Sequence, residues 1–400
     1  MTELMNRLAA LAQCTDGDGL TRLFLSPAHQ RAAALVKSWM EQAGLTAHID
    51  AIGNVVGRNA TPGPRLILGS HIDTVRNAGW YDGNYGVLAA IEALARCQSL
   101  PLGVEVIAFG DEEGVRFPTT LAGSRAIAGI FDPKTLIGRD AAGTTISAAL
   151  QAFGGDPDLI ITEARNPADV LGYIELHIEQ GPVLEANNLP AGIVTAIAGA
   201  SRYAVTINGA AGHAGTVPMA MRRDALTTAA EFFLAVEATA RAHPHTVATV
   251  GTVTVKPGAP NSIPGEVTFT IDLRAPEEST RHAAGEEIAA AFTRIASARH
   301  QTFTITQTHN APATACAPWL KSQLAAALKT HNIPPFHLPS GAGHDAMALA
   351  SLCPVAMLFI RCAGGISHTP AESITAEDAE TGVQILISLL QNFRPEPKNA

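Results

Sequence analysis

The sequence is 400 residues long and 47% hydrophobic, and its 27 Lys and Arg against 36 Asp and Glu give a formal net charge of −9. This length suits two domains, the dispersed basic residues argue against a nucleic-acid partner, and no apolar run reaches the roughly 18 residues of a membrane span. The five scattered cysteines exclude a thiolate zinc cluster and are typical of a reducing cytoplasm. Residues 1–15 predict an amphipathic helix without signal-peptide features, so we expect a cytoplasmic protein.

A short strand is predicted at residues 66–68, because apolar residues at consecutive positions are typical of a strand buried in a parallel sheet. It runs into Ser70-His71-Ile72-Asp73-Thr74. In an extended segment His71 and Asp73 point to the same side, so Asp73 can accept the proton of one ring nitrogen and leave the other free for a metal. The alternative at this point is a core histidine with a hydrogen-bonded neighbour.

Three more predicted strands deliver polar residues at their ends. They span residues 104–110, 171–176 and 354–360, and they lead to Asp111-Glu112-Glu113, to His177-Ile178-Glu179-Gln180 and, through Gly364-Gly365, to His368. Asp82 lies just before a helix predicted at residues 87–96. Because ligands of open parallel sheets bind beyond the carboxyl ends of the strands, we expect these side chains to share one edge of the sheet.

After about residue 200 the pattern changes. Strands predicted at 203–207, 246–255, 266–274 and 302–307 alternate apolar and polar residues, and helices are predicted at 223–242 and 279–299. The order β-α-β-β-α-β indicates a ferredoxin-like α+β unit. Beyond Pro312 the α/β pattern resumes with helices near 318–330 and 375–392. We therefore expect a mixed, mostly parallel α/β catalytic domain at 1–197 and 312–400, with an inserted domain at 198–311.

The alternation inside the inserted domain places two arginines on one face. In the strand 266–274 the apolar side chains point one way, which leaves Arg274 on the opposite face. The strand 203–207 puts the preceding Arg202 on the same face. Two arginines on an open polar sheet predict a site for a carboxylate. The alternatives are a solvated face and a dimer contact.

The candidates from the strand ends comprise three imidazoles and two carboxylates: His71, Asp82, Glu113, His177 and His368. Such a set without thiolates suits divalent zinc, manganese, cobalt or nickel. Five ligands are too many for one tetrahedral catalytic zinc with an open position, but they suit two ions that share a bridging carboxylate. We choose Asp82 as the bridge because its side chain is short and it lies between the other ligands in sequence, a choice that the sequence does not force.

The adjacent acids Glu112 and Glu113 indicate a division of labour. Neighbouring carboxylates repel each other unless a cation lies between them or one is protonated. One glutamate can bind metal while the other acts as general base on a metal-bound water. The alternative is two solvent-exposed acids in a loop.

Seven motifs in order carry a resemblance to a known family. They are Gly69-Ser70-His71-Ile72-Asp73-Thr74-Val75, Tyr81-Asp82-Gly83, Asp111 to Phe117, Leu176 to Glu185, Gly212-His213-Ala214-Gly215-Thr216-Val217-Pro218-Met219, Gly341-Ala342-Gly343-His344-Asp345-Ala346 and Ile366-Ser367-His368. Over nearly its whole length the chain resembles the amidase/hydantoinase/carbamoylase branch of the M20 metallopeptidase superfamily. The resemblance implies a catalytic α/β domain, an inserted dimerisation domain and a homodimer.

The resemblance also implies roles for the metal candidates. It pairs His71 with His368 in one metal site and Glu113 with His177 in the other, with Asp82 as the bridge. It makes Glu112 the general base, and it makes Asp73 the partner that orients His71.

Further residues match substrate positions of this family. The resemblance implies that His213, contributed by the small domain of the partner subunit, stabilises the oxyanion. Asn261 and Arg274 match substrate-binding positions, and Arg202 matches an arginine of allantoate enzymes. Gln180 and the backbone at Gly343 are pocket candidates.

The function expected from the resemblance is hydrolysis of a ureido C–N bond with two divalent ions per subunit. The leading substrate is allantoate, which would give ureidoglycine with release of ammonia and carbon dioxide. The alternatives are an N-carbamoyl-L-amino acid hydrolase and a β-ureidopropionase, and a dipeptidase is less expected. A binding protein without catalysis on this fold would lack a metal ligand or the general base. The sequence contains all five candidate ligands and the candidate base Glu112.

Overall fold

The computed structural model describes residues 2–97 and 99–396. Residues 1, 98 and 397–400 belong to the predicted ranges 1–15, 1–197 and 312–400 and lie outside the described residues. Contacts within the chain divide it into two compact units. Unit 1 comprises Met1–Thr195, Cys316–Leu338 and Ala342–Ala400, and unit 2 comprises Ala196–Ala315 and Pro339–Gly341. Each unit is described by itself below.

Unit 1 is built on a mixed sheet in the order β1-β2-β4-β3-β5-β15-β6. Its strands are β1 (Thr46–Ile49), β2 (Val55–Arg58), β3 (Arg65–His71), β4 (Gly103–Phe109), β5 (Val170–Ile178), β6 (Ala191–Ile197) and β15 (Val355–Ile360). The central strands β4, β3, β5 and β15 run parallel, whereas β2 and β6 pair antiparallel at the sides. These central strands are buried along most of their length, as their continuous apolar runs predict.

The registers of the parallel strands bring their carboxyl ends level with one another. His71 at the end of β3 pairs with Phe109 at the end of β4. On the other side, His177 of β5 pairs with Phe359 of β15. Side chains that follow these four strands therefore meet at one edge of the sheet, where ligands of such sheets bind.

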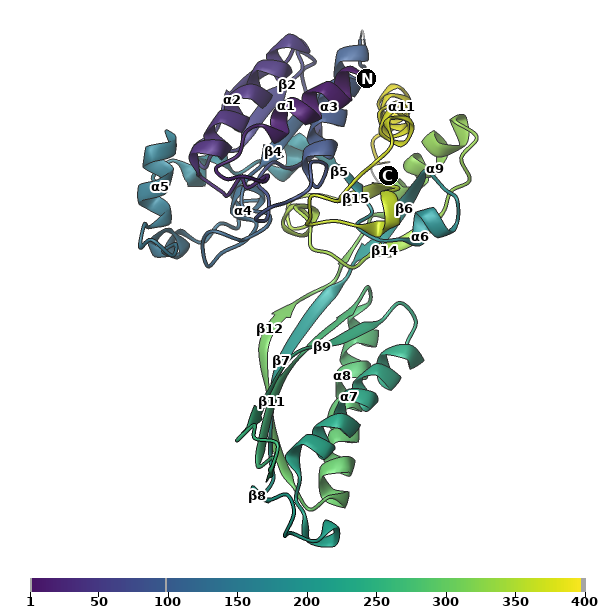
Figure 1. Cartoon of the computed structure of the whole chain (residues 1–400). Coiled ribbons are helices and arrows are strands. Elements are labelled where there is room, and N and C mark those ends of the chain that lie inside the picture. Colours follow the sequence, from purple (N-terminus) through teal and green to yellow (C-terminus); the bar gives the residue numbers. More distant parts are fainter. Residues whose placement is uncertain (1, 98, 397–400) are drawn as a thin grey trace. The chain divides into compact units, whose positions relative to one another are not determined.

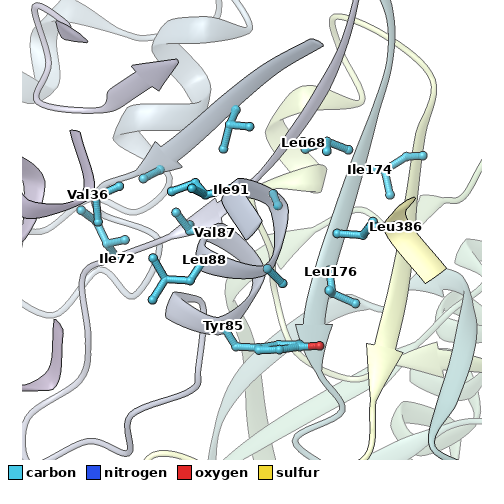
Figure 2. Packing of buried hydrophobic residues seen from close by; sticks show 14 of the residues in the cluster. Val36, Leu68, Ile72, Tyr85, Val87, Leu88, Ile91, Ile174, Leu176 and Leu386 are labelled. Atoms are coloured by element: carbon cyan, nitrogen blue, oxygen red, sulfur yellow. The ribbon is translucent and has the colours of Figure 1, made fainter. Parts of the chain in front are cut away.

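Helix α3 (Asn84–Arg96) connects β3 to β4 and packs on β3, β5 and α11 (Ala376–Asn392). Figure 2 shows Tyr85, Val87, Leu88 and Ile91 of this helix among apolar side chains of β3, β5 and α11. The Tyr85 hydroxyl donates a hydrogen bond to the Ala379 carbonyl at 2.9 Å. Burying such side chains contributes about 1.5–3 kcal/mol each. This packing fixes the start of α3, and with it the segment that carries Asp82.

The other helices of unit 1 complete its layers. They are α1 (Glu3–Ala12), α2 (Pro27–Gln42), α4 (Ala122–Ile127), α5 (Ile146–Phe153), α6 (Val183–Ala186), α9 (Pro318–Thr330) and α10 (Ala346–Leu349). Helix α1 confirms the amphipathic helix expected near the amino terminus, with its leucines buried. Among the described residues, no helix has the length and apolarity that a membrane crossing requires.

Unit 2 carries an antiparallel sheet in the order β12-β7-β11-β9, with two helices on one face (Figure 1). Its elements are β7 (Gly199–Asn208), α7 (Ala225–Ala242), β9 (Val247–Lys256), β11 (Glu266–Ala275), α8 (Glu278–Ala298) and β12 (Thr302–Ala311). The chain order β-α-β-β-α-β and this strand order confirm the ferredoxin-like arrangement. The shorter strands β8 (Gly212–His213) and β10 (Ser262–Ile263) pair with each other, whereas β13 (Thr314–Ala315) and β14 (His337–Ser340) both pair with β6 and extend the larger sheet.

The core of unit 2 lies between its sheet and its helices. The Phe232 and Phe292 rings stack with centroids 3.8 Å apart, and Phe269 of β11 meets both edge-on. The apolar residues of β11 are buried at alternate positions, as the pattern predicts. The opposite face of the sheet is left to the polar residues, among them Arg202 and Arg274.

Candidate metal centre

The structure brings the five predicted metal ligands together at the carboxyl edge of the unit 1 sheet. His71 is the last residue of β3, and His177 lies near the end of β5. Glu113 follows β4, and His368 follows β15. Asp82 lies directly before Gly83, the residue that caps α3.

Asp82 stands at the centre of this cluster, and its two carboxylate oxygens face different partners. Oδ1 lies 3.5 Å from His71 Nε2 and 3.1 Å from His177 Nε2. Oδ2 lies 3.1 Å from His368 Nε2, which in turn lies 3.7 Å from Glu113 Oε2. A carboxylate placed in this way is suited to bridge two ions.

The grouping of the ligands differs from the expected one. Among the described residues, potential ligand atoms within 4.8 Å of one another form the groups His71-Asp82-His177 and Asp82-Glu113-His368. His71 therefore shares its group with His177 rather than with His368. The reason is the strand order, because β3 and β5 are neighbours, whereas β15 lies beyond β5.

Hydrogen bonds fix both buried imidazoles in the orientation that a metal needs. His71 Nδ1 donates to the Asp73 carbonyl at 3.0 Å, and His177 Nδ1 donates to the Ile178 carbonyl at 2.8 Å. Since a carbonyl only accepts, a proton sits on Nδ1, and Nε2 of each ring faces Asp82. Gly83 leaves room for this, because a Cβ there would lie 2.5 Å from the His71 ring, and its φ of +66° favours glycine.

Asp73 acts differently from the prediction. Its carboxylate lies 3.8 Å from His71 Nδ1, and the hydrogen bond from that ring goes to the Asp73 main-chain carbonyl. The chain leaves β3 at His71, so the extended geometry assumed for the pair does not continue. The Asp73 carboxylate instead accepts the backbone N–H groups of Glu112 and Glu113 at 3.1 and 3.2 Å. Asp73 therefore orients His71 through its carbonyl and the acidic loop through its side chain.

The electrostatics of the cluster fit a cationic group. Burial and the Asp82 carboxylate raise the pKa of Glu113 to about 7. The hydrogen bond to Asp82 raises the pKa of His368 to about 9, although burial opposes this. Glu113 Oε1 is buried without a hydrogen-bond partner. Imidazole nitrogens and carboxylate oxygens that converge in this way, with one oxygen still free, suit two divalent ions of the zinc or manganese type.

Glu112 is separated from the ligand groups. Its Oε2 lies 3.9 Å from His71 Nε2, and it belongs to neither group among the described residues. Burial is the main cause that raises the Glu112 pKa well above its usual range. The preceding Asp111 has a φ of +69°, an uncommon value for a non-glycine residue, so the chain turns sharply before the two acids. This geometry leaves Glu112 available for proton transfer.

Several residues that contact the site were not predicted from the sequence, or were predicted with a different role. Gln180, predicted as a pocket residue, donates to Asp82 Oδ2 at 2.7 Å. Glu175 lies two residues before His177 on β5, and both belong to a third group of potential ligands with His344. An acid inside a buried apolar strand was a signal for Glu175. Glu372 and Ser367, which also contact the Asp82 segment, lie in a polar loop where no periodic pattern marks them.

Within unit 2, the structure pairs two of the predicted substrate residues. The ladder between β8 and β10 sets His213 opposite Ser262, and the Ala214 N–H donates to the Asn261 carbonyl at 2.9 Å. The exposed His213 accepts the Gly215 N–H on its Nδ1 at 3.1 Å. In the neutral ring the proton therefore sits on Nε2, which is ready to donate.

The two arginines of unit 2 share one carboxylate. Arg274 donates to both Asp272 oxygens at 2.8 and 3.1 Å, and Arg202 donates to Asp272 Oδ2 at 3.0 Å. Arg274 also donates to the Gly341 carbonyl at 2.8 Å. Two positive charges around one negative charge leave a net positive site. Gly343, the last pocket candidate, lies in the unit 1 segment between β14 and α10.

Comparisons with known proteins agree with this fold. The sequence pattern of a family described as peptidase family M20/M25/M40 matches residues 67–392. The chain is 42% identical to a protein named N-carbamoyl-L-amino acid amidohydrolase from Geobacillus stearothermophilus, with 92% of each chain covered. It is also 42% identical to a probable allantoate deiminase from Oryza sativa subsp. japonica, covering 97% of this chain and 87% of that protein.

A solved structure shows the same fold. An amidase of the hydantoinase/carbamoylase family from Burkholderia multivorans superposes with a TM-score of 0.92 at 32% identity, over 99% of this chain and 98% of that chain. The resemblance stated from the motifs and the expected fold class are both confirmed.

Proposed function

Because the chain belongs to the peptidase family M20/M25/M40 and is a hydrolase of C–N bonds, we propose that it is a two-metal amidohydrolase. Its reaction would be cleavage of a ureido C–N bond in a small substrate that bears a carboxylate. The observation that carries this proposal is the division of the two Asp82 oxygens between two groups of ligands.

Two divalent ions would share Asp82, one held by His71 and His177 and the other by Glu113 and His368. When bound, such ions lower the pKa of a water and polarise a carbonyl oxygen. Zinc or manganese suits the donor set best, and cobalt or nickel is compatible with it.

Glu112 is the proposed general base. It would take a proton from the attacking water and return it to the leaving nitrogen. Support comes from its burial next to His71, its absence from both ligand groups, and the anchoring of its backbone by Asp73.

His213 is the proposed donor to the oxyanion that forms on the ureido carbonyl. The backbone of Gly215 holds its Nδ1 as an acceptor, so Nε2–H is available. A donor aimed at developing charge contributes about 2.7–4 kcal/mol to the transition state.

Arg274 and Arg202 are the proposed carboxylate site, with Asn261 as a further substrate contact. The Asp272 carboxylate holds both guanidinium groups in place, and their combined charge stays positive. Arginine binds carboxylates with fixed, often bidentate geometry. Gln180 and Gly343 complete the proposed substrate contacts.

We propose allantoate as the substrate, with ureidoglycine, ammonia and carbon dioxide as products. The relatives named allantoate deiminase and the Arg202 match support this choice. An N-carbamoyl-L-amino acid is the second candidate, because a protein of that specificity is equally similar in sequence. N-carbamoyl-β-alanine is the third.

The remaining proposals concern assembly and location. Unit 1 would be the catalytic domain, and the insertion at 198–311 would serve as a dimerisation domain or lid in a homodimer. The cysteine usage supports a cytoplasmic location.

One experiment tests the proposed function. Protein freed of metal is reloaded with zinc or manganese and assayed for ammonia release on allantoate, on N-carbamoyl-L-amino acids and on N-carbamoyl-β-alanine. We expect two equivalents of metal per chain and the highest kcat/KM on allantoate. Higher kcat/KM on an N-carbamoyl amino acid would replace the substrate, and no metal-dependent ammonia release from any ureide would refute the function.

A further inference from the structure

Glu372 is an acidic residue without a role in the proposed chemistry, and it is almost completely buried, at 5% exposure. Its Oε1 accepts two backbone N–H groups, from Tyr81 at 2.7 Å and from Asp82 at 3.0 Å. These residues precede α3, far from Glu372 in sequence. A single carboxylate oxygen thus holds the main chain that presents Asp82.

The second oxygen of Glu372 reaches the segment that carries His368. Glu372 Oε2 lies 3.0 Å from the Ser367 hydroxyl, which also lies 2.8 Å from Asp82 Oδ2. Asp82 Oδ2 is the oxygen that faces His368. The Ser367 hydroxyl therefore lies between the Glu372 and Asp82 carboxylates, and because it has one proton, it donates to one of them at a time.

Gly79 makes room for this contact. A Cβ at Gly79 would overlap the Cβ and the carboxyl group of Glu372. Gly79 is not among the residues with positive φ, so its backbone does not itself require glycine. Its lack of a side chain is therefore explained by the space that Glu372 occupies.

We propose that Glu372 is a positioning residue that joins the Asp82 segment to the Ser367-His368 segment and so assembles the ligand group Asp82-Glu113-His368. The inference rests on the proposed two-metal function. Ordering two remote segments costs conformational entropy. The Glu372 contacts hold both segments in place in the folded chain, so this ordering precedes the binding of any ion.

The chemistry of the contacts predicts how substitutions behave. In Glu372→Gln the amide oxygen can still accept both N–H groups. Its NH2 can donate to Ser367, whose own proton then goes to Asp82. Glu372→Ala removes all three contacts and leaves two buried N–H groups without this acceptor. Gly79→Ala keeps the carboxylate but displaces it.

The test measures metal binding rather than activity alone. Metal-free protein is titrated with Zn²⁺ by calorimetry, and bound zinc is counted after dialysis, for the wild type and for E372A, E372Q and G79A. Glu377→Ala is the matched control, because it removes an exposed acid from the start of α11. Far-UV circular dichroism and the melting temperature of each metal-free variant report on folding.

We expect E372A and G79A to bind one equivalent of zinc with an affinity close to that of the wild type and the second about 10–100-fold more weakly. E372Q and E377A should bind both equivalents like the wild type. Wild-type binding of two equivalents by E372A would overturn the inference, and so would an equal loss in E372Q. A wild type that binds no second equivalent would refute the proposed function itself. If E372A does not fold, G79A and E372Q still decide the question.

Discussion

Three of the proposed metal ligands in unit 1 and three of the proposed substrate residues in unit 2 occupy opposite kinds of environment, whereas the side chain of the ligand His368 is 50% exposed. His71 and His177 are each 1% exposed and Asp82 is 4% exposed. In unit 2, the Arg202 side chain is 52% exposed, and His213 and Asn261 are exposed as well. Chemistry that depends on a fixed ligand geometry lies in the buried set, whereas substrate recognition is proposed for the accessible set.

The two environments follow from two kinds of sheet. Parallel strands are covered on both faces, so their ligand-binding groups gather at the carboxyl ends, where His71 and His177 are buried and held by backbone hydrogen bonds. The antiparallel sheet of unit 2 packs helices on one face and leaves the other to solvent. The comparison therefore predicts that substitutions of the buried ligands in unit 1 change metal content, whereas substitutions of the proposed substrate residues in unit 2 change kinetics alone.

The largest effect is expected for Asp82→Ala. Because Asp82 contributes to both ligand groups, its loss should release both ions and reduce activity below detection. Metal analysis after dialysis and an ammonia-release assay measure the two effects. The exposed Asp18→Ala is the matched control and should keep both ions. Retention of two ions by the Asp82 variant would remove it from the bridging position.

Glu112→Gln should lower kcat about 10²–10⁴-fold while both ions stay bound. The amide has nearly the shape of the carboxylate but cannot take a proton from water. Steady-state kinetics combined with metal analysis separate the two readouts. Loss of an ion together with activity would make Glu112 a ligand instead of the base.

His213→Ala should lower kcat about 10²–10³-fold with unchanged metal content, which is the sharpest test of the contrast between the units. The variant lacks the proposed Nε2–H donor to the oxyanion. His282→Ala, which removes an exposed imidazole from α8, should have wild-type kinetics. A drop in metal content in the His213 variant would break the division between the two units.

Arg274→Ala should raise KM for substrates that bear a carboxylate about 10–100-fold, since hydrogen bonds to charged groups contribute about 1.5–3 kcal/mol. Its effect on a ureide without a carboxylate should be small. The control is Arg241→Ala, which breaks an exposed pair with Glu237 on α7. An equal loss on the uncharged ureide would remove Arg274 from carboxylate binding.

The smallest effect concerns stability and lies in unit 1 outside the site. Burial lowers the pKa of His29 to about 3, and its Nδ1 accepts the Leu25 N–H at 3.1 Å. The folded state keeps His29 neutral, while the unfolded chain takes up a proton below about pH 6.5. The folded state therefore loses stability as pH falls from about 6.5 towards 3.

Between pH 7 and pH 5 this contributes a loss of about 2 kcal/mol. Urea unfolding of metal-free wild type and His29→Asn at both pH values measures it. Asparagine can keep an acceptor for Leu25 but does not titrate, so its stability should fall about 2 kcal/mol less. Equal losses in both proteins would show that His29 does not control this pH dependence.

Much of the fold was predictable because it depends on local patterns. Consecutive apolar residues indicated the buried strands that end near His71 and His177, and alternation indicated the strand that carries Arg274. The helix expected from residue 87 begins at Asn84 instead, because the backbone turns at Gly83. That turn is set by the close approach of the His71 ring, a contact that no periodicity records.

The sequence by itself determined which residue types stand at each strand end, and so the donor set and the family. Only the tertiary structure decided how these residues are grouped. It grouped His71 with His177 and directed the Asp73 carboxylate to the backbone N–H of Glu112. It also placed the Glu372 carboxylate where it accepts the backbone N–H of Asp82. The physical reason is that strand patterns depend on neighbours along the chain, whereas grouping depends on strand order and on hydrogen bonds between remote segments.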